Sequence, residues 1–204
     1  LLCLVCQLAE AWQLFVGPGG DGDAQPNSTL LQGLRVGDPV ELKLRYPASL
    51  RLHDVEFLHD VNIDDAVFEH SVDLTECRFI GRLSARDTTI KGAFRLDESS
   101  FDGIDPDYRK GKRKPVIDLH GVVVDGGLFA DRVTVFGRVR MKWARIGATL
   151  RARGLQIHPR SAEAGEDDKD VALDCSHARI GGPLDLRAYD PKGARPGKSH
   201  RRTV

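Results

Sequence analysis

Aromatic residues, cysteines and long apolar runs are all scarce in this 204-residue sequence. Aromatic residues make up 6% of the chain, so we expect little aromatic stacking and no large aromatic pocket. The Cys3 and Cys6 pair has no second pair beside it, which argues against a metal site, a disulfide framework and an oxidising compartment. The most apolar stretch, residues 1–16, contains Glu10 and is too short to cross a membrane alone.

The sequence also lacks the motifs of the common catalytic and nucleotide-binding sites. It contains no glycine-rich phosphate loop, no strand–glycine–helix dinucleotide signature and no recognisable order of Ser, His and Asp. We therefore predict no catalytic, cofactor-binding or metal-binding residue and no cofactor.

Net charge is absent as well, but the two halves of the chain differ in sign. Residues 1–104 hold 9 Lys and Arg against 17 Asp and Glu, whereas residues 105–204 hold 21 against 13. A rod built in chain order would be electrically polar. Such a rod could associate head to tail or bind an anionic partner at its C-terminal half.

The sequence does contain an eleven-residue repeat between positions 50 and 103. One series of large residues consists of Phe57, Phe68, Phe79, Ile90 and Phe101. A second series consists of Leu50, Val61, Val72, Leu83 and Phe94. Smaller residues precede the first series by two places, at Val55, Ala66, Cys77, Thr88 and Ser99. A fixed period this short indicates a solenoid, in which stacked units bury a shared core.

The spacing within the repeat predicts an all-β parallel β-helix with four sides. Inward residues alternate with outward ones over three positions, as in very short strands, and glycines recur where a helix would need good helix formers. The steps between inward residues alternate between five and six, so four sides need 22 residues and each repeat is half a coil. Cys77 and Cys175 take inward positions and are expected to act as small apolar core side chains.

The inward pairs carry a resemblance to a known family. Ala66–Val67–Phe68, Cys77–Arg78–Phe79 and Ala178–Arg179–Ile180 resemble the steps of pentapeptide-repeat proteins, whose fold is a right-handed four-sided β-helix. Stretches such as 144–147 and 178–186 are also similar to bacterial β-helical proteins labelled membrane-associated oxidoreductases. The resemblance implies a fold, and it implies little about activity because solenoids host many functions.

The pattern divides the chain into three parts. Residues 34–188 are expected to form the β-helix, with polar insertions near 102–115 and 158–170 that each add twelve residues to the period. Residues 1–33 are expected to be a helix and linker, either capping the solenoid or ending a membrane helix. Residues 189–204 read as a disordered basic tail.

Stacking at one coil's spacing predicts columns of charge. Opposite charges at Asp118, Arg140 and Asp174 would form structural ion ladders. Like charges would stack in two acidic corner columns, which are candidate surfaces for a cation, a basic partner or, in the enzyme alternative, a glycan substrate. The first column consists of Asp54, Glu76 and Glu98, and the second of Asp65 and Asp87.

Basic residues gather in the C-terminal half and are candidates for binding a partner. We expect one face to carry Arg138, Arg140, Lys142, Arg145, Arg151 and Arg153. The first insertion adds Arg109, Lys110, Lys112, Arg113 and Lys114. Either set could meet nucleic acid or lipid headgroups, or could simply be a solvated surface.

These observations favour a non-catalytic scaffold or protein-interaction module. It could belong to a larger membrane-associated bacterial protein, and we expect a cytoplasmic or membrane-associated location rather than a secreted one. Two alternatives stay open: an enzyme that acts on a glycan or polymer along the acidic columns, and a module that binds an anionic polymer or membrane surface. A protein partner is the first expectation, with head-to-tail self-association beside it.

Overall fold

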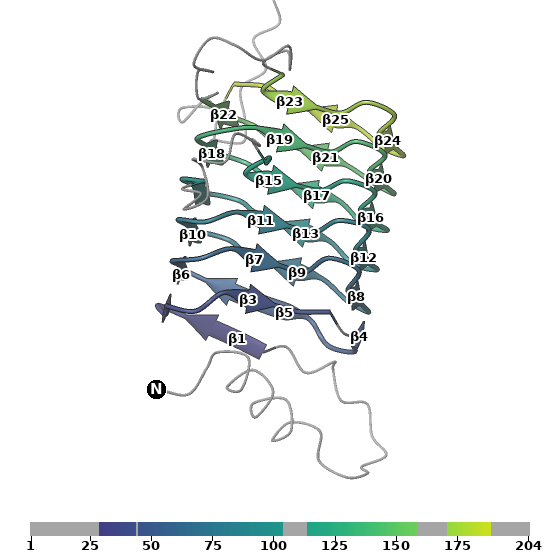
Figure 1. Ribbon diagram of the computed structural model, residues 1–204. Coiled ribbons are helices and arrows are strands. Elements are labelled where there is room, and N and C mark those ends of the chain that lie inside the picture. Colours follow the sequence, from purple (N-terminus) through teal and green to yellow (C-terminus); the bar gives the residue numbers. More distant parts are fainter. Residues whose placement is uncertain (1–28, 44, 104–113, 159–170, 189–204) are drawn as a thin grey trace, which may run out of the picture.

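The computed structural model describes residues 29–43, 45–103, 114–158 and 171–188. In these ranges the chain is a β-solenoid whose 25 short strands stack in four parallel sheets (Figure 1). No helix occurs in this part of the chain. The predicted four-sided, all-β parallel solenoid is confirmed, whereas the expected N-terminal helix lies outside the described residues.

Each sheet receives one strand from each successive coil. Sheet A contains β1 (Thr29–Gln32), β5 (Leu50–His53), β9 (Val72–Asp73), β13 (Phe94–Arg95), β17 (Leu128–Phe129), β21 (Leu150–Arg151) and β25 (Leu184–Asp185). Sheet B contains β2 (Arg35–Val36), β6 (Glu56–Phe57), β10 (Arg78–Phe79), β14 (Ser100–Phe101), β18 (Thr134–Val135) and β22 (Gln156–Ile157).

The other two sides of the coil have the same construction. Sheet C contains β3 (Val40–Glu41), β7 (Val61–Asn62), β11 (Leu83–Ser84), β15 (Ile117–Asp118), β19 (Val139–Arg140) and β23 (Leu173–Asp174). Sheet D contains β4 (Arg45–Tyr46), β8 (Val67–Phe68), β12 (Thr89–Ile90), β16 (Val123–Val124), β20 (Arg145–Ile146) and β24 (Arg179–Ile180).

The register of the strands gives the length of a coil directly. Phe68 pairs with Ile90, 22 positions later, as the repeat predicts. Where an insertion intervenes the step is 34, as from Leu150 to Leu184, so the insertions re-enter in register. The first coil is one residue shorter, because Val40 pairs with Val61. β1 precedes residue 34 and already pairs with β5.

The core is a column of inward side chains that continues from coil to coil. Phe68, Phe79 and Ile90 are fully buried, and the small residues Ala66 and Cys77 beside them are buried too. Burial of a large apolar side chain contributes about 1.5–3 kcal/mol, so each coil is stabilised mainly by its own inward residues and those of its neighbours.

Aromatic rings stack along this column, contrary to the expectation from composition. The ring centroids of Phe57 and Phe79 lie 4.8 Å apart, and those of Phe79 and Phe101 lie 4.5 Å apart. Tyr46 stacks on Phe68 in the same way. The expectation was wrong because the strand register, and not the number of aromatic residues, decides which side chains meet. An aromatic residue that recurs once per coil lies directly over the aromatic residue of the coil before it.

Two of the four corners use a left-handed backbone residue. Asp65, at φ +59°, closes a turn in which the Ala66 amide donates to the Ile63 carbonyl. Equivalent residues with positive φ follow sheet A at Asp54, Glu76, Glu98, Arg132 and Gly154 and follow sheet C at Asp87, Gly121, Trp143 and His177. Asp and Gly suit this conformation, whereas Trp is an outlier in it.

The last described coil is less covered than those before it. Leu184 and Leu186 are 56% and 52% exposed, although their counterparts in earlier coils are buried. Cys77 is buried, but Cys175 is exposed, so the prediction that both are core side chains is wrong for Cys175. The reason is position: Cys175 lies in the final described coil, where no further described coil packs on it.

Candidate functional site

The acidic candidates lie at the two left-handed corners. Asp54, Glu76 and Glu98 follow β5, β9 and β13, and the amide of each donates to a carbonyl in the next coil. Asp65 and Asp87 occupy the corresponding corner between sheets C and D. The structure therefore stacks them as columns, and their role in binding stays a prediction.

Basic partners relieve part of the repulsion in the first acidic column. Glu98 forms an ion pair with Arg132, the next residue of the same column. Glu76 Oε1 lies 3.5 Å from His53 Nε2. Glu76 and Glu98 thus each have a basic neighbour, and the left-handed backbone suits an aspartate at position 54, so these three residues do not require a bound cation. Within the described ranges, no three His, Cys, Asp or Glu side chains are arranged to hold a metal ion.

The basic candidates do not share one face, which corrects the sequence interpretation. Arg138, Arg140 and Lys142 belong to sheet C and its edge, Arg145 to sheet D, and Arg151 and Arg153 to sheet A. The chain turns a corner every five or six residues, so a basic run in sequence is divided among faces. Lys114 is exposed, whereas Arg109, Lys110, Lys112 and Arg113 lie outside the described residues.

Ion pairs between coils neutralise much of the charge on sheets A, B and C. On sheet B, Arg78 lies 3.2 Å from Glu56 and 3.0 Å from Asp102. On sheet A, Arg151 lies 2.8 Å from Asp131 and also covers the Phe129 ring. On sheet C, Asp118 and Asp174 flank Arg140 in register, as predicted.

A polar groove of about 680 Å³ runs along sheet C. Its charged groups largely satisfy one another: Asp118 pairs with Arg140 and raises the pKa of that guanidinium. The hydroxyl and amide of Ser176 donate to Asp174, and these bonds lower the pKa of its carboxyl. The groove is therefore a hydrophilic surface whose ion pairs any ligand would have to displace.

The corner between sheets C and D carries an exposed aromatic stack. Trp143 is 50% exposed, and its ring lies on the imidazole of His177 with centroids 4.1 Å apart. Both residues have positive φ, at +63° and +60°. Left-handed backbone costs an ordinary side chain about 1 kcal/mol, and the same column is occupied by Asp or Gly in the earlier coils.

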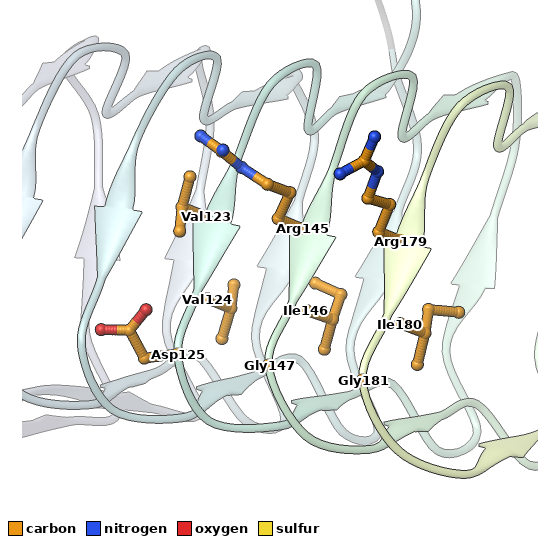
Figure 2. Close-up of a pocket in the computed structure, with 9 residues that line it drawn as sticks. All are labelled: Val123, Val124, Asp125, Arg145, Ile146, Gly147, Arg179, Ile180 and Gly181. Carbon is orange, nitrogen blue, oxygen red and sulfur yellow. The ribbon is translucent and has the colours of Figure 1, made fainter.

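Two arginines stand beside this stack on sheet D. Arg145 and Arg179 start β20 and β24, are paired in register and are exposed. Neither guanidinium has an ion-pair or hydrogen-bond partner among the described residues. They border a shallow hollow of about 510 Å³ over β16, β20 and β24. Figure 2 shows both guanidinium groups at the end where the strands begin, away from the Asp125 carboxylate.

We call Trp143, Arg145, His177 and Arg179 the C/D corner cluster. Sequence reasoning missed it, because the column of Asp65 and Asp87 was followed only for its acidic residues and not onward across the 34-position step. The signal was present: counting the Asp65 and Asp87 column onward through both insertions leads to Trp143 and His177. Glycine also shapes this surface, since a Cβ at Gly147 would lie 2.2 Å from the Asp125 carbonyl oxygen.

The comparisons with known proteins add no name to this architecture. No family model, curated protein or solved structure matches the chain. Among the described residues, no helix has the length and apolar character of a membrane span. The conclusion from the fold and the site is therefore a four-sided parallel β-solenoid, with no family named.

Proposed function

We propose that this chain is a non-catalytic binding module, in which stacked coils hold outward side chains at fixed spacing for a macromolecular partner. Adjacent coils are joined by backbone hydrogen bonds on all four sheets. Outward side chains in one column are therefore held at a fixed spacing of about 4.8 Å. A preorganised surface of this kind binds without a large ordering cost.

One observation carries the proposal: Arg145 and Arg179 are neighbours of the same sign without described partners. On the strands of the other three sheets, charged residues that pair in register have opposite signs, as with Arg140 and Asp174. Like charges directly opposite each other destabilise a sheet, so this pair has a cost in the free chain that an anionic group would remove. The geometry thus supports an anionic partner more specifically than a partner of unstated charge.

We also propose that the chain is related to the pentapeptide-repeat proteins. The fully buried pairs Ala66–Phe68 and Cys77–Phe79 support the resemblance to pentapeptide-repeat proteins, and with it a right-handed coil. Parallel strands joined through a crossover are right-handed in nearly all proteins, which favours the same hand. Association with a membrane rests on the sequence resemblance and on the apolar stretch 1–16, which lies outside the described residues.

The test is to immobilise the full chain, equilibrate it with a cell extract, and compare the captured material before and after prolonged incubation. The proposal expects saturable complexes whose ligand is recovered at unchanged length and mass. Shortening of a captured glycan or other polymer that disappears in the Glu76→Ala/Glu98→Ala variant would contradict it. That result would establish the enzyme alternative, provided circular dichroism shows the variant folded.

A further inference from the structure

We propose that the C/D corner cluster is a binding site for single-stranded nucleic acid, with a base stacked on the Trp143–His177 pair and phosphates held by Arg145 and Arg179. This inference rests on the proposed binding function and names its ligand class. Three properties of the cluster lead to it: exposed stacked rings, two arginines beside them that have no partner among the described residues, and a spacing set by the coil.

The aromatic pair supplies the stacking surface. Trp143 remains half exposed although His177 covers part of it, and the earlier residue of the same column is Gly121, which has no side chain. Bases stack on exposed aromatic rings without regard to sequence, and each contact is worth roughly 5- to 150-fold in affinity. The left-handed backbone at Trp143 keeps this large ring on the outside of the corner.

The arginines supply the charge at a matching distance. Arg145 and Arg179 each follow their ring-bearing residue by two positions, so each arginine begins the strand directly after the corner that holds the ring. Figure 2 places their guanidinium groups at the beginning of the strands, which is the side nearest the corner. A chain of nucleotides likewise carries a flat base and an anionic phosphate at each step, so it can contact both features together.

Three other classes of anionic partner fit less well. An acidic peptide could pair with the arginines, but it would leave the exposed ring stack unused. A lipid surface needs a broad basic plane, whereas Asp125 lies at the far end of the same hollow. Duplex DNA hides the faces of its bases, so it could use only the arginines.

The inference can be tested by measuring the affinity of the full chain for a labelled 12-nucleotide DNA of mixed sequence and for its RNA counterpart. Fluorescence anisotropy measures binding at 50 and 200 mM salt. Trp143→Gly suits the backbone and should weaken binding about tenfold. Arg145→Gln/Arg179→Gln should weaken binding and flatten the log K against log salt slope by about 1.4.

Matched controls come from sheet B. Arg35→Gln/Arg78→Gln removes the same charge, and Phe136→Leu breaks another exposed ring–histidine stack, in which the centroids of Phe136 and His158 lie 5.0 Å apart. Both controls should leave affinity within about twofold of the unmodified chain. A thermal melt shows that each variant is folded, and Trp143→Asn repeats the test if the glycine variant is not.

Four results would overturn the inference. These are no saturable binding at 50 mM salt, equal losses in the control variants, duplex bound as tightly as single strand, and binding of poly-glutamate or anionic vesicles in place of the oligonucleotide. In the last case the binding-module proposal stands and only the ligand class is wrong. Capture of no ligand of any kind would count against both.

Discussion

Trp143 is the residue that departs furthest from its column. The corner demands a left-handed backbone, which Asp65, Asp87 and Gly121 accept at lower cost than a bulky ring does. A side chain that is strained, exposed and stacked on its neighbour contributes little to the core. Strain of this kind is concentrated at binding and active sites, and it is one reason for proposing this position as part of a binding surface.

Close packing between coils can be tested at a single glycine. Gly147→Ala should destabilise the protein by about 1–3 kcal/mol, since the new Cβ would lie 2.2 Å from a backbone oxygen that cannot move alone. Gly37→Ala is the control, because nothing lies within 4 Å of its Cβ position. Urea unfolding measures both. Equal stability of the two variants would mean that the coils are not as close as described.

The described cysteines should differ sharply in reactivity. Burial raises the pKa of the Cys77 thiol to about 12, and that thiol lies 3.2 Å from the Leu52 carbonyl oxygen. We expect iodoacetamide at pH 8 to modify Cys175, which is exposed, and to leave Cys77 unmodified until the chain unfolds. Peptide mapping by mass spectrometry reads both sites. Early labelling of Cys77 would show that the core opens.

At the scale of elements, residues that recur at the same place in each coil lie on top of one another, so a period in the sequence becomes a stack of similar side chains. Strands of two residues have little stability of their own, and each is held by the strands one coil before and after it. The core ladders on sheet B illustrate this, with Phe57, Phe79 and Phe101 arranged ring on ring. The same geometry builds the exposed Trp143–His177 pair, so the buried and the exposed stacks have one cause.

Removing a ring from the middle of a core ladder should be costly. Phe79→Ala loses contacts with both neighbours and leaves a cavity, so we expect a loss of about 3–5 kcal/mol in the free energy of unfolding. Phe136→Ala, at a ring that is 39% exposed, should cost about 1 kcal/mol or less. Denaturant titration monitored by circular dichroism separates the two. A small effect at Phe79 would argue against the ladder.

The fold was largely predictable from these elements, and the site was not. The spacing of Phe57, Phe68 and Phe79 fixed the inward positions, and register across the insertions followed from counting. Partners on the surface could not be read in the same way: Glu98 pairs with Arg132 across an insertion, and the basic residues 138–153 separate onto three sheets. The repeat places outward side chains in columns, but their residue types follow no period, so the sequence does not show which of them pair.

At the scale of the whole molecule, ion pairs between coils link stability to pH. Lys91 and Arg45 lower the pKa of Glu69, and Arg187 and Arg153 lower that of Asp185. A carboxyl whose pKa is lower in the folded state stabilises the fold above its unfolded pKa. That stabilisation is lost as pH falls through the folded value.

We therefore expect the melting temperature to be level near neutral pH and to fall below about pH 4.5, the ordinary value for glutamate. Calorimetry between pH 7 and pH 3 measures this. The loss should be smaller in Glu69→Gln, which has no such carboxyl to protonate. A melting temperature that rises on acidification would contradict the sign of the linkage.

Residues 34 positions apart lie side by side at the C/D corner, and an engineered disulfide tests this proximity. Neighbouring parallel strands place Cα atoms about 4.8 Å apart, within the 4.4–6.8 Å that a disulfide spans. In a background with Cys3, Cys6 and Cys175 replaced by Ser, Arg145→Cys/Arg179→Cys should oxidise to an intramolecular disulfide, seen by mass. Arg145→Cys/Arg187→Cys should not, because Arg145 lies on sheet D whereas Arg187 follows β25 of sheet A. Oxidation of the second pair and not the first would contradict the account.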